Sequence, residues 1–68
     1  MSKVIYSNLI AEMARKKITQ KKLGEMLGLT NVAIHQRLYG TTEWKLSEIC
    51  FLMNYFKLGF DYLFEREN

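Results

Sequence analysis

The sequence predicts an all-α domain, a compact bundle of five short helices, and three observations support this prediction. The chain of 68 residues contains no proline. Its apolar residues recur at the spacing of helices, and no segment alternates convincingly between apolar and polar residues. Four pairs of apolar residues, five positions apart, each straddle a residue that can cap a helix, which is the pattern of a hydrophobic staple.

The first helix is predicted to begin with Ser7 as its N-cap, because a serine side chain can accept a backbone N–H of the first turn. Its apolar face is expected to comprise Tyr6, Leu9, Ile10, Met13 and Ala14. The cations Arg15, Lys16 and Lys17 fall in its last turn, where they complement the helix dipole. We expect this basic run to face solvent, although a phosphate-binding role is the alternative.

The next four helices are predicted to begin after Thr19, Thr30, Lys45 and Gly59. The corresponding apolar pairs are Ile18 with Leu23, Leu29 with Ile34, Trp44 with Ile49, and Leu58 with Leu63. Trp44 is therefore expected to be part of the core. The connections are short, so the helices must fold back on one another at once.

The fourth and fifth helices contain more apolar residues than one buried face requires. We expect the core side of the fourth helix to comprise Leu46, Ile49, Cys50, Met53 and Phe56, with Cys50 as a small buried apolar residue. The aromatic residues Phe51, Tyr55, Phe60, Tyr62 and Phe64 are then predicted to form a homodimer interface. The alternative is that the fifth helix covers them.

Composition limits the classes of protein that fit. An apolar content of 49% is too high for a disordered segment. One cysteine and one histidine cannot form an internal disulfide or a zinc site. No apolar run approaches the roughly 20 residues of a membrane span. We expect a single soluble, cytoplasmic domain over residues 1–68, without a metal, cofactor, small-molecule ligand or catalytic residues.

Charge is distributed unevenly along the chain. Residues 1–45 contain eight basic and three acidic residues, whereas residues 46–68 contain two basic and four acidic residues. A polyanion is therefore expected to bind the first two thirds of the chain, and the last third is better suited to a core or a protein contact.

Residues 19–39 are expected to form two helices joined by a tight turn. Gly24 provides the small residue that a close helix crossing needs, and Gly28 tolerates a positive φ in the turn. Leu29 fills the corner between the helices.

The spacing of Gln20, Gly24, Gly28, Leu29, Ile34 and Gly40 resembles the helix-turn-helix of phage Cro and repressor proteins, the XRE family. Trp44, Leu46, Ile49 and the segment Asp61–Phe64 extend this resemblance over residues 7–64. The resemblance implies a lambda-repressor-like fold, with a helix from Asn31 to Tyr39 in the major groove of DNA. Residues 1–6 would be an N-terminal arm, and 45–64 the C-terminal helices.

The same resemblance assigns roles to individual residues. Base contacts are expected from Asn31, Val32, Gln36 and His35. The alternative for Asn31, His35 and Gln36 is simple exposure, and His35 could also contact a phosphate. Phosphate contacts are expected from Gln20, Lys21, Thr30, Arg37, Thr41, Thr42 and Lys45. Tyr39 is left open between the edge of the core and a backbone contact.

The resemblance favours a non-enzymatic, Cro- or repressor-like transcription regulator of phage or prophage origin, which binds operator DNA as a homodimer; the sign of regulation stays open. The main alternative is a protein-interaction module on the same scaffold, such as an antitoxin or anti-repressor, because the last third is rich in aromatic residues. An enzyme is disfavoured because no nucleophile, base and metal ligands form a recognisable set.

Overall fold

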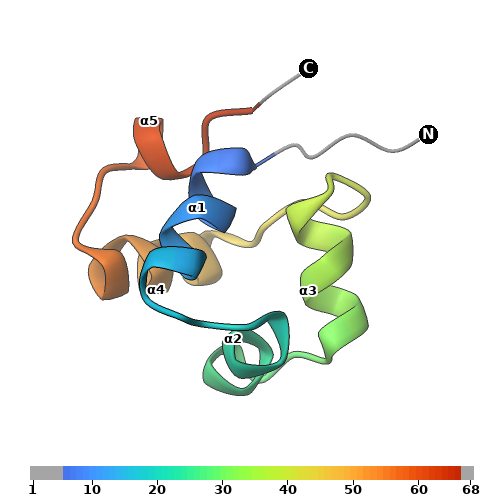
Figure 1. Cartoon of the computed structure of the whole chain (residues 1–68). Coiled ribbons are helices and arrows are strands. Elements are labelled where there is room, and N and C mark those ends of the chain that lie inside the picture. Colours follow the sequence, from blue (N-terminus) through green and yellow to red (C-terminus); the bar gives the residue numbers. More distant parts are fainter. Residues whose placement is uncertain (1–5, 67–68) are drawn as a thin grey trace.

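The computed structural model describes residues 6–66, which form five α-helices without a strand among them (Figure 1). The helices are α1 (Ser7–Arg15), α2 (Gln20–Leu27), α3 (Asn31–Leu38), α4 (Leu46–Phe56) and α5 (Phe60–Leu63). The predicted all-helical class is therefore confirmed for the described residues. Residues 1–5 of the expected N-terminal arm lie outside them. None of the helices in this part of the chain is long and apolar enough to cross a membrane.

The four predicted helix starts after the first are confirmed. The side-chain oxygen of Thr19 accepts the Lys22 backbone N–H at 3.1 Å, and that of Thr30 accepts the Ala33 N–H at 3.1 Å. Lys45 and Gly59 occupy the N-cap positions of α4 and α5 without capping side chains. Local sequence chemistry thus determines where these helices begin.

The start of α1 differs from the prediction. Ser7 is the first helical residue and Tyr6 occupies the cap position, without a side-chain cap hydrogen bond. Tyr6 is instead anchored by burial, because its ring lies edge-on to Trp44 and Phe64 with ring centroids 6.5 and 6.0 Å away. The expectation that Ala14 lies on the buried face is also wrong, since Ala14 is exposed.

One apolar core joins residues from all five helices and the loops between them. Six side chains in it are essentially inaccessible to solvent: Leu9, Leu23, Ile34, Leu38, Leu52 and Leu63. The eight members of the predicted staples all belong to this core or pack against it. The staples therefore orient each helix as it leaves its cap.

The predicted core face of α4 is partly wrong. Leu46 is 76% exposed and Cys50 is exposed, whereas Leu52, which the prediction omitted, is fully buried. Glu48 is buried on the inner side of the same helix. The helix is rotated so that its inner face follows Glu48, Leu52 and Phe56, which places Leu46 and Cys50 outside.

The joint between α2 and α3 shows why two glycines occur there. Gly28 ends α2 with φ of +73°, a conformation that costs other L-residues free energy. A Cβ atom on Gly24 would lie 2.5 Å from the Leu29 carbonyl oxygen, so only glycine fits at this crossing without a shift. The two helices are steeply inclined to each other and joined by three residues (Figure 1).

Candidate functional site

The outer face of α3 is an uncovered row of polar and apolar side chains. Asn31, His35 and Gln36 are exposed, and Val32 keeps 65% of its surface open. On the opposite side of the helix, Ile34 and Leu38 are buried in the core. The four residues predicted to contact bases therefore share one exposed face, which is called the α3 row below.

The fifth helix does not cover the α3 row. It packs on α1 and α4, and Figure 1 shows α5 and α3 on opposite sides of the molecule. The imidazole of His35 lies against the ring of Tyr39, with centroids 4.4 Å apart and a tilt of 33°. This contact limits the orientations of His35, while the remaining members of the row face solvent.

Arg37 does not belong to the exposed surface, contrary to its predicted role in phosphate contact. Its side chain is 8% exposed, and its Nε donates to Glu48 Oε1 at 2.9 Å. Its Nη1 also donates to the Ala33 carbonyl within α3, at 3.3 Å. The same Glu48 oxygen accepts the backbone N–H of Lys45 at 3.0 Å. The guanidinium thus joins the end of α3 to the start of α4 and is not free to meet an external anion.

Sequence reasoning missed the role of Glu48. The signal was present, because a glutamate three residues after the cap position matches the spacing of a capping box. The buried arginine partner could not be inferred from that spacing.

The other predicted phosphate contacts are polar groups around α3. Lys21, Thr30, Thr41 and Lys45 are exposed, and Gln20 and Thr42 are half-buried. The backbone N–H groups of Thr41 and Thr42 both donate to the Gln36 carbonyl, at 2.8 and 3.2 Å, so this loop is fixed to α3. Gln20 lines a hollow of about 220 Å³ together with Leu38 and Tyr39. The start of α2 and the end of α3 are therefore neighbours.

The predicted aromatic interface divides into an outer and an inner part. Phe51, Tyr55, Phe60 and Tyr62 are exposed, and the rings of Phe51 and Tyr55 are stacked with centroids 6.2 Å apart. Phe64 is 7% exposed and belongs to the core, so its expected place at the interface is wrong. Of the predicted interface residues, the first four are therefore the exposed ones.

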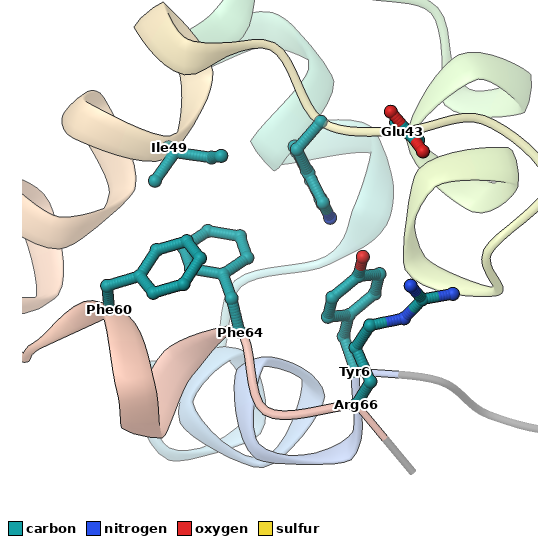
Figure 2. A pocket seen from close by; sticks show the side chains of 7 residues that line it. Tyr6, Glu43, Ile49, Phe60, Phe64 and Arg66 are labelled. Carbon is teal, nitrogen blue, oxygen red and sulfur yellow. The ribbon is translucent and has the colours of Figure 1, made fainter. Parts of the chain in front are cut away.

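Phe64 is buried because it closes an aromatic cluster beneath α5. Its ring lies edge-on to Tyr6 and Trp44 and stacks against Phe60. A hollow of about 180 Å³ adjoins this cluster, with Ile49 and Phe60 at one end and Glu43 and Arg66 near the other (Figure 2). The Nε1 atom of Trp44 is buried without a hydrogen-bond partner among the described residues.

Polar contacts hold α5 against α1. The Tyr62 hydroxyl donates to Glu12 Oε2 at 2.9 Å, and this hydrogen bond raises the pKa of Tyr62 above its ordinary value of 10.0. Asn8 Nδ2 donates to the Tyr62 carbonyl at 2.9 Å and to Glu65 Oε1 at 3.0 Å. These bonds fix α5 in a position that leaves four aromatic side chains outside.

Comparisons with protein-family models, curated proteins and solved structures find no match for this chain. Within residues 6–66, His, Cys, Asp and Glu side chains do not gather in groups of three or more that could hold a metal ion. The surface features that remain to be interpreted are the α3 row, the polar groups around it and the exposed aromatics.

Proposed function

We propose that this protein is a sequence-specific regulator that binds double-stranded DNA through α3. The observation that supports the proposal best is the α3 row, four exposed side chains on a helix whose other side is anchored by Ile34 and Leu38. A groove-binding helix needs such an open, rigidly held face. In this proposal α2, the three-residue loop and α3 act as a helix-turn-helix.

The chemistry of the α3 row suits the edges of base pairs. The amides of Asn31 and Gln36 can each donate to and accept from adenine N7 and N6, and Val32 can contact a thymine methyl group. The exposed face offers no guanidinium for guanine, because Arg37 is paired with Glu48. We therefore expect an operator half-site that favours A·T pairs.

Phosphate contacts come from the groups that border the row. Gln20 and Lys21 lie at the start of α2, where free backbone N–H groups and the helix dipole favour an anion. Thr30 caps the start of α3, Thr41 and Thr42 follow its end, and Lys45 precedes α4. Such contacts fix the position of a protein on DNA but do not distinguish sequences.

The exposed aromatic side chains support homodimerisation as the second part of the proposal. Phe51 and Tyr55 lie on α4, and Phe60 and Tyr62 lie on α5, which is on the side of the molecule opposite α3 (Figure 1). A symmetric dimer would present two copies of α3 about 34 Å apart to the two halves of a palindromic operator. Occupation of the operator would exclude polymerase or a competing regulator.

Selection of binding sites from a library of random duplexes tests this function. We expect an enriched, palindromic sequence that the wild-type protein binds at least 10³ times more tightly than random duplex, as specific regulators do. Gln36→Ala should relax the preference at one position in each half-site, at a cost of about 1–3 kcal/mol. Lys21→Ala should weaken binding to all sequences alike. Failure of the selection to enrich any sequence would contradict the proposal.

A protein-interaction module is the second candidate, and the four exposed aromatic residues favour it. Under this function the exposed aromatic side chains bind another small protein. No particular DNA sequence is then bound more tightly than random duplex. Size-exclusion chromatography with light scattering, combined with the selection from random duplexes, separates the two functions. A homodimer that also selects an operator excludes the module as the main function.

A further inference from the structure

The burial of Arg37 leaves the α3 row without a formal positive charge. None of its members, Asn31, Val32, His35 and Gln36, is a lysine or an arginine. Binding of a polyanion nevertheless depends on cations that displace the counterions of phosphates. The charge that attracts DNA must therefore lie elsewhere on the surface.

We infer that the turn between α1 and α2 binds the phosphates that flank the operator half-site contacted by α3. This basic corner comprises Arg15, Lys16, Lys17, Lys21 and Lys22, all of which are exposed. The inference rests on the proposed DNA-binding function and adds a phosphate-contacting surface to it.

The basic corner is the strongest concentration of free positive charge in the described residues. No acidic residue occurs between Met13 and Gly24, and the exposed Glu25 that follows forms no ion pair with a residue in 6–66. Glu12, which precedes this stretch, is buried and accepts a hydrogen bond from the Tyr62 hydroxyl. Arg15 is the corner residue that approaches it, with its Nε 3.7 Å from Glu12 Oε2. Lys16, Lys17, Lys21 and Lys22 form no ion pair with any residue in 6–66.

The remaining exposed cations are more scattered. Lys45 follows Glu43 by two residues, and Arg66 follows Glu65 directly. Lys57 stands alone between α4 and α5. Because the potentials of like charges add, the basic corner attracts a polyanion more strongly than any of these sites.

The backbone of the corner is fixed in a way that presents the lysines outward. Lys17 adopts a left-handed conformation with φ of +57° at the end of α1. The Ile18 N–H donates to the Met13 carbonyl at 2.8 Å, the bond of a Schellman motif, and the Ile18 side chain is buried. Gln20 and Lys21, two of the groups proposed to contact phosphate, follow Lys17 by three and four residues at the start of α2 (Figure 1). A duplex backbone that reaches the start of α2 also comes within reach of the flexible side chains of Lys16 and Lys17.

The double variant Lys16→Gln/Lys17→Asn tests the inference by removing two charges. Asparagine is chosen at position 17 because it tolerates the left-handed conformation. The matched control is Lys57→Asn, since Lys57 also ends a helix, is exposed and has φ of +58°. Duplex binding is measured by fluorescence anisotropy between 50 and 200 mM salt, on the selected operator and on random DNA.

Loss of two phosphate contacts should reduce the slope of log affinity against log salt by about 1.8. The wild-type affinity should then fall about twelvefold more than that of the variant across this fourfold range of salt, which follows from the same slope. The effect should be equal on the operator and on random DNA, and Lys57→Asn should keep the wild-type slope. Lys16→Gln alone should give about half the change.

The inference is wrong if the double variant keeps the wild-type slope, or if Lys57→Asn lowers the slope as much. Either result would leave the proposed function intact, provided that the wild-type protein still prefers its operator. A wild-type protein that binds no duplex would overturn both the function and the inference.

Discussion

Replacement of Arg37 by methionine should destabilise the protein strongly, although the residue lies at the edge of the core. The change leaves Glu48 buried with only the backbone N–H of Lys45 as a donor, at 3.0 Å. Removal of one partner from a buried ion pair costs about 3–5 kcal/mol, and the remaining N–H bond places this case near the lower end. A domain of this size has a net stability of only about 3–5 kcal/mol, so Arg37→Met should bring it close to unfolding.

The double variant Arg37→Met/Glu48→Leu should recover most of this loss. It removes both charges together and fills their volume with apolar atoms, a replacement that is often neutral or favourable. It still loses the bond that Glu48 accepts from Lys45, worth about 1 kcal/mol. The free energy of unfolding of the double variant should therefore be about 1 kcal/mol below that of the wild type and well above that of either single variant.

Thermal and urea denaturation, followed by circular dichroism at a single protein concentration, measure these differences. Because 1 kcal/mol corresponds to about 4–8 °C in a domain of 60–100 residues, Arg37→Met should lower Tm by about 12–24 °C. A loss below 1 kcal/mol for Arg37→Met, or a double variant as unstable as the sum of the single variants, would refute this account of the pair.

Three further predictions follow from the described geometry. Gly24→Ala should destabilise the protein by about 2–3 kcal/mol in urea denaturation, because the new methyl group would meet the Leu29 carbonyl oxygen at 2.5 Å and overpacking costs this much. Gly28→Ala should cost about 1–2 kcal/mol in the same assay, because φ is +73° but the space around the glycine is open. The hydrogen bond to Glu12 raises the pKa of Tyr62 in the folded state above the unfolded value of 10.0. The unfolded state therefore loses this proton first as pH rises above 10, and the wild type loses stability there. Tyr62→Phe should abolish this loss.

Each of these predictions has an outcome that contradicts it. The glycine account is wrong if Gly28→Ala is the more damaging change, since only Gly24 faces a backbone atom. The Tyr62 account is wrong if the wild type and Tyr62→Phe lose stability in parallel between pH 10 and 11. Tyr55→Phe is the matched control for the second case, because the exposed hydroxyl of Tyr55 forms no hydrogen bond with a residue in 6–66.

Helix starts were predictable because their determinants are local. Thr19 and Thr30 each satisfy a backbone N–H three residues later, and the apolar residues on either side of each cap identify the direction of the helix. The roles of Gly24 and Gly28 were predictable for a similar reason. Glycine lowers the stability of a helix unless a close contact or a positive φ requires it. Ser7 failed as a cap because the burial of Tyr6 beside Trp44 determines where α1 begins.

The orientation of α4 was not predictable from periodicity. Apolar residues occupy most of its positions, so several faces have similar hydrophobicity. Sequence patterns place Glu48 outside, whereas the structure places it inside, opposite Arg37. In this orientation Leu52 is buried and Leu46 and Cys50 are exposed. The position of a charged residue, which periodicity does not reveal, thus accompanies the choice of apolar face.

The exposure of the α3 row was predictable, whereas the burial of Arg37 was not. The buried positions Ile34 and Leu38 determine by helical spacing which neighbours face outward. The same spacing gave no reason to place Arg37 inside, because its partner Glu48 belongs to another helix.

Removal of Arg37 from the surface separates two properties of the proposed DNA complex. In this proposal the α3 row distinguishes base pairs but has little charge to attract phosphates, and the basic corner supplies that charge without contacting base edges. Substitutions in the row should therefore change sequence preference at nearly constant salt dependence. Substitutions in the corner should change salt dependence at constant preference. Had Arg37 been exposed on α3, one side chain could have contributed to both properties, and the two effects would not be separable by mutation.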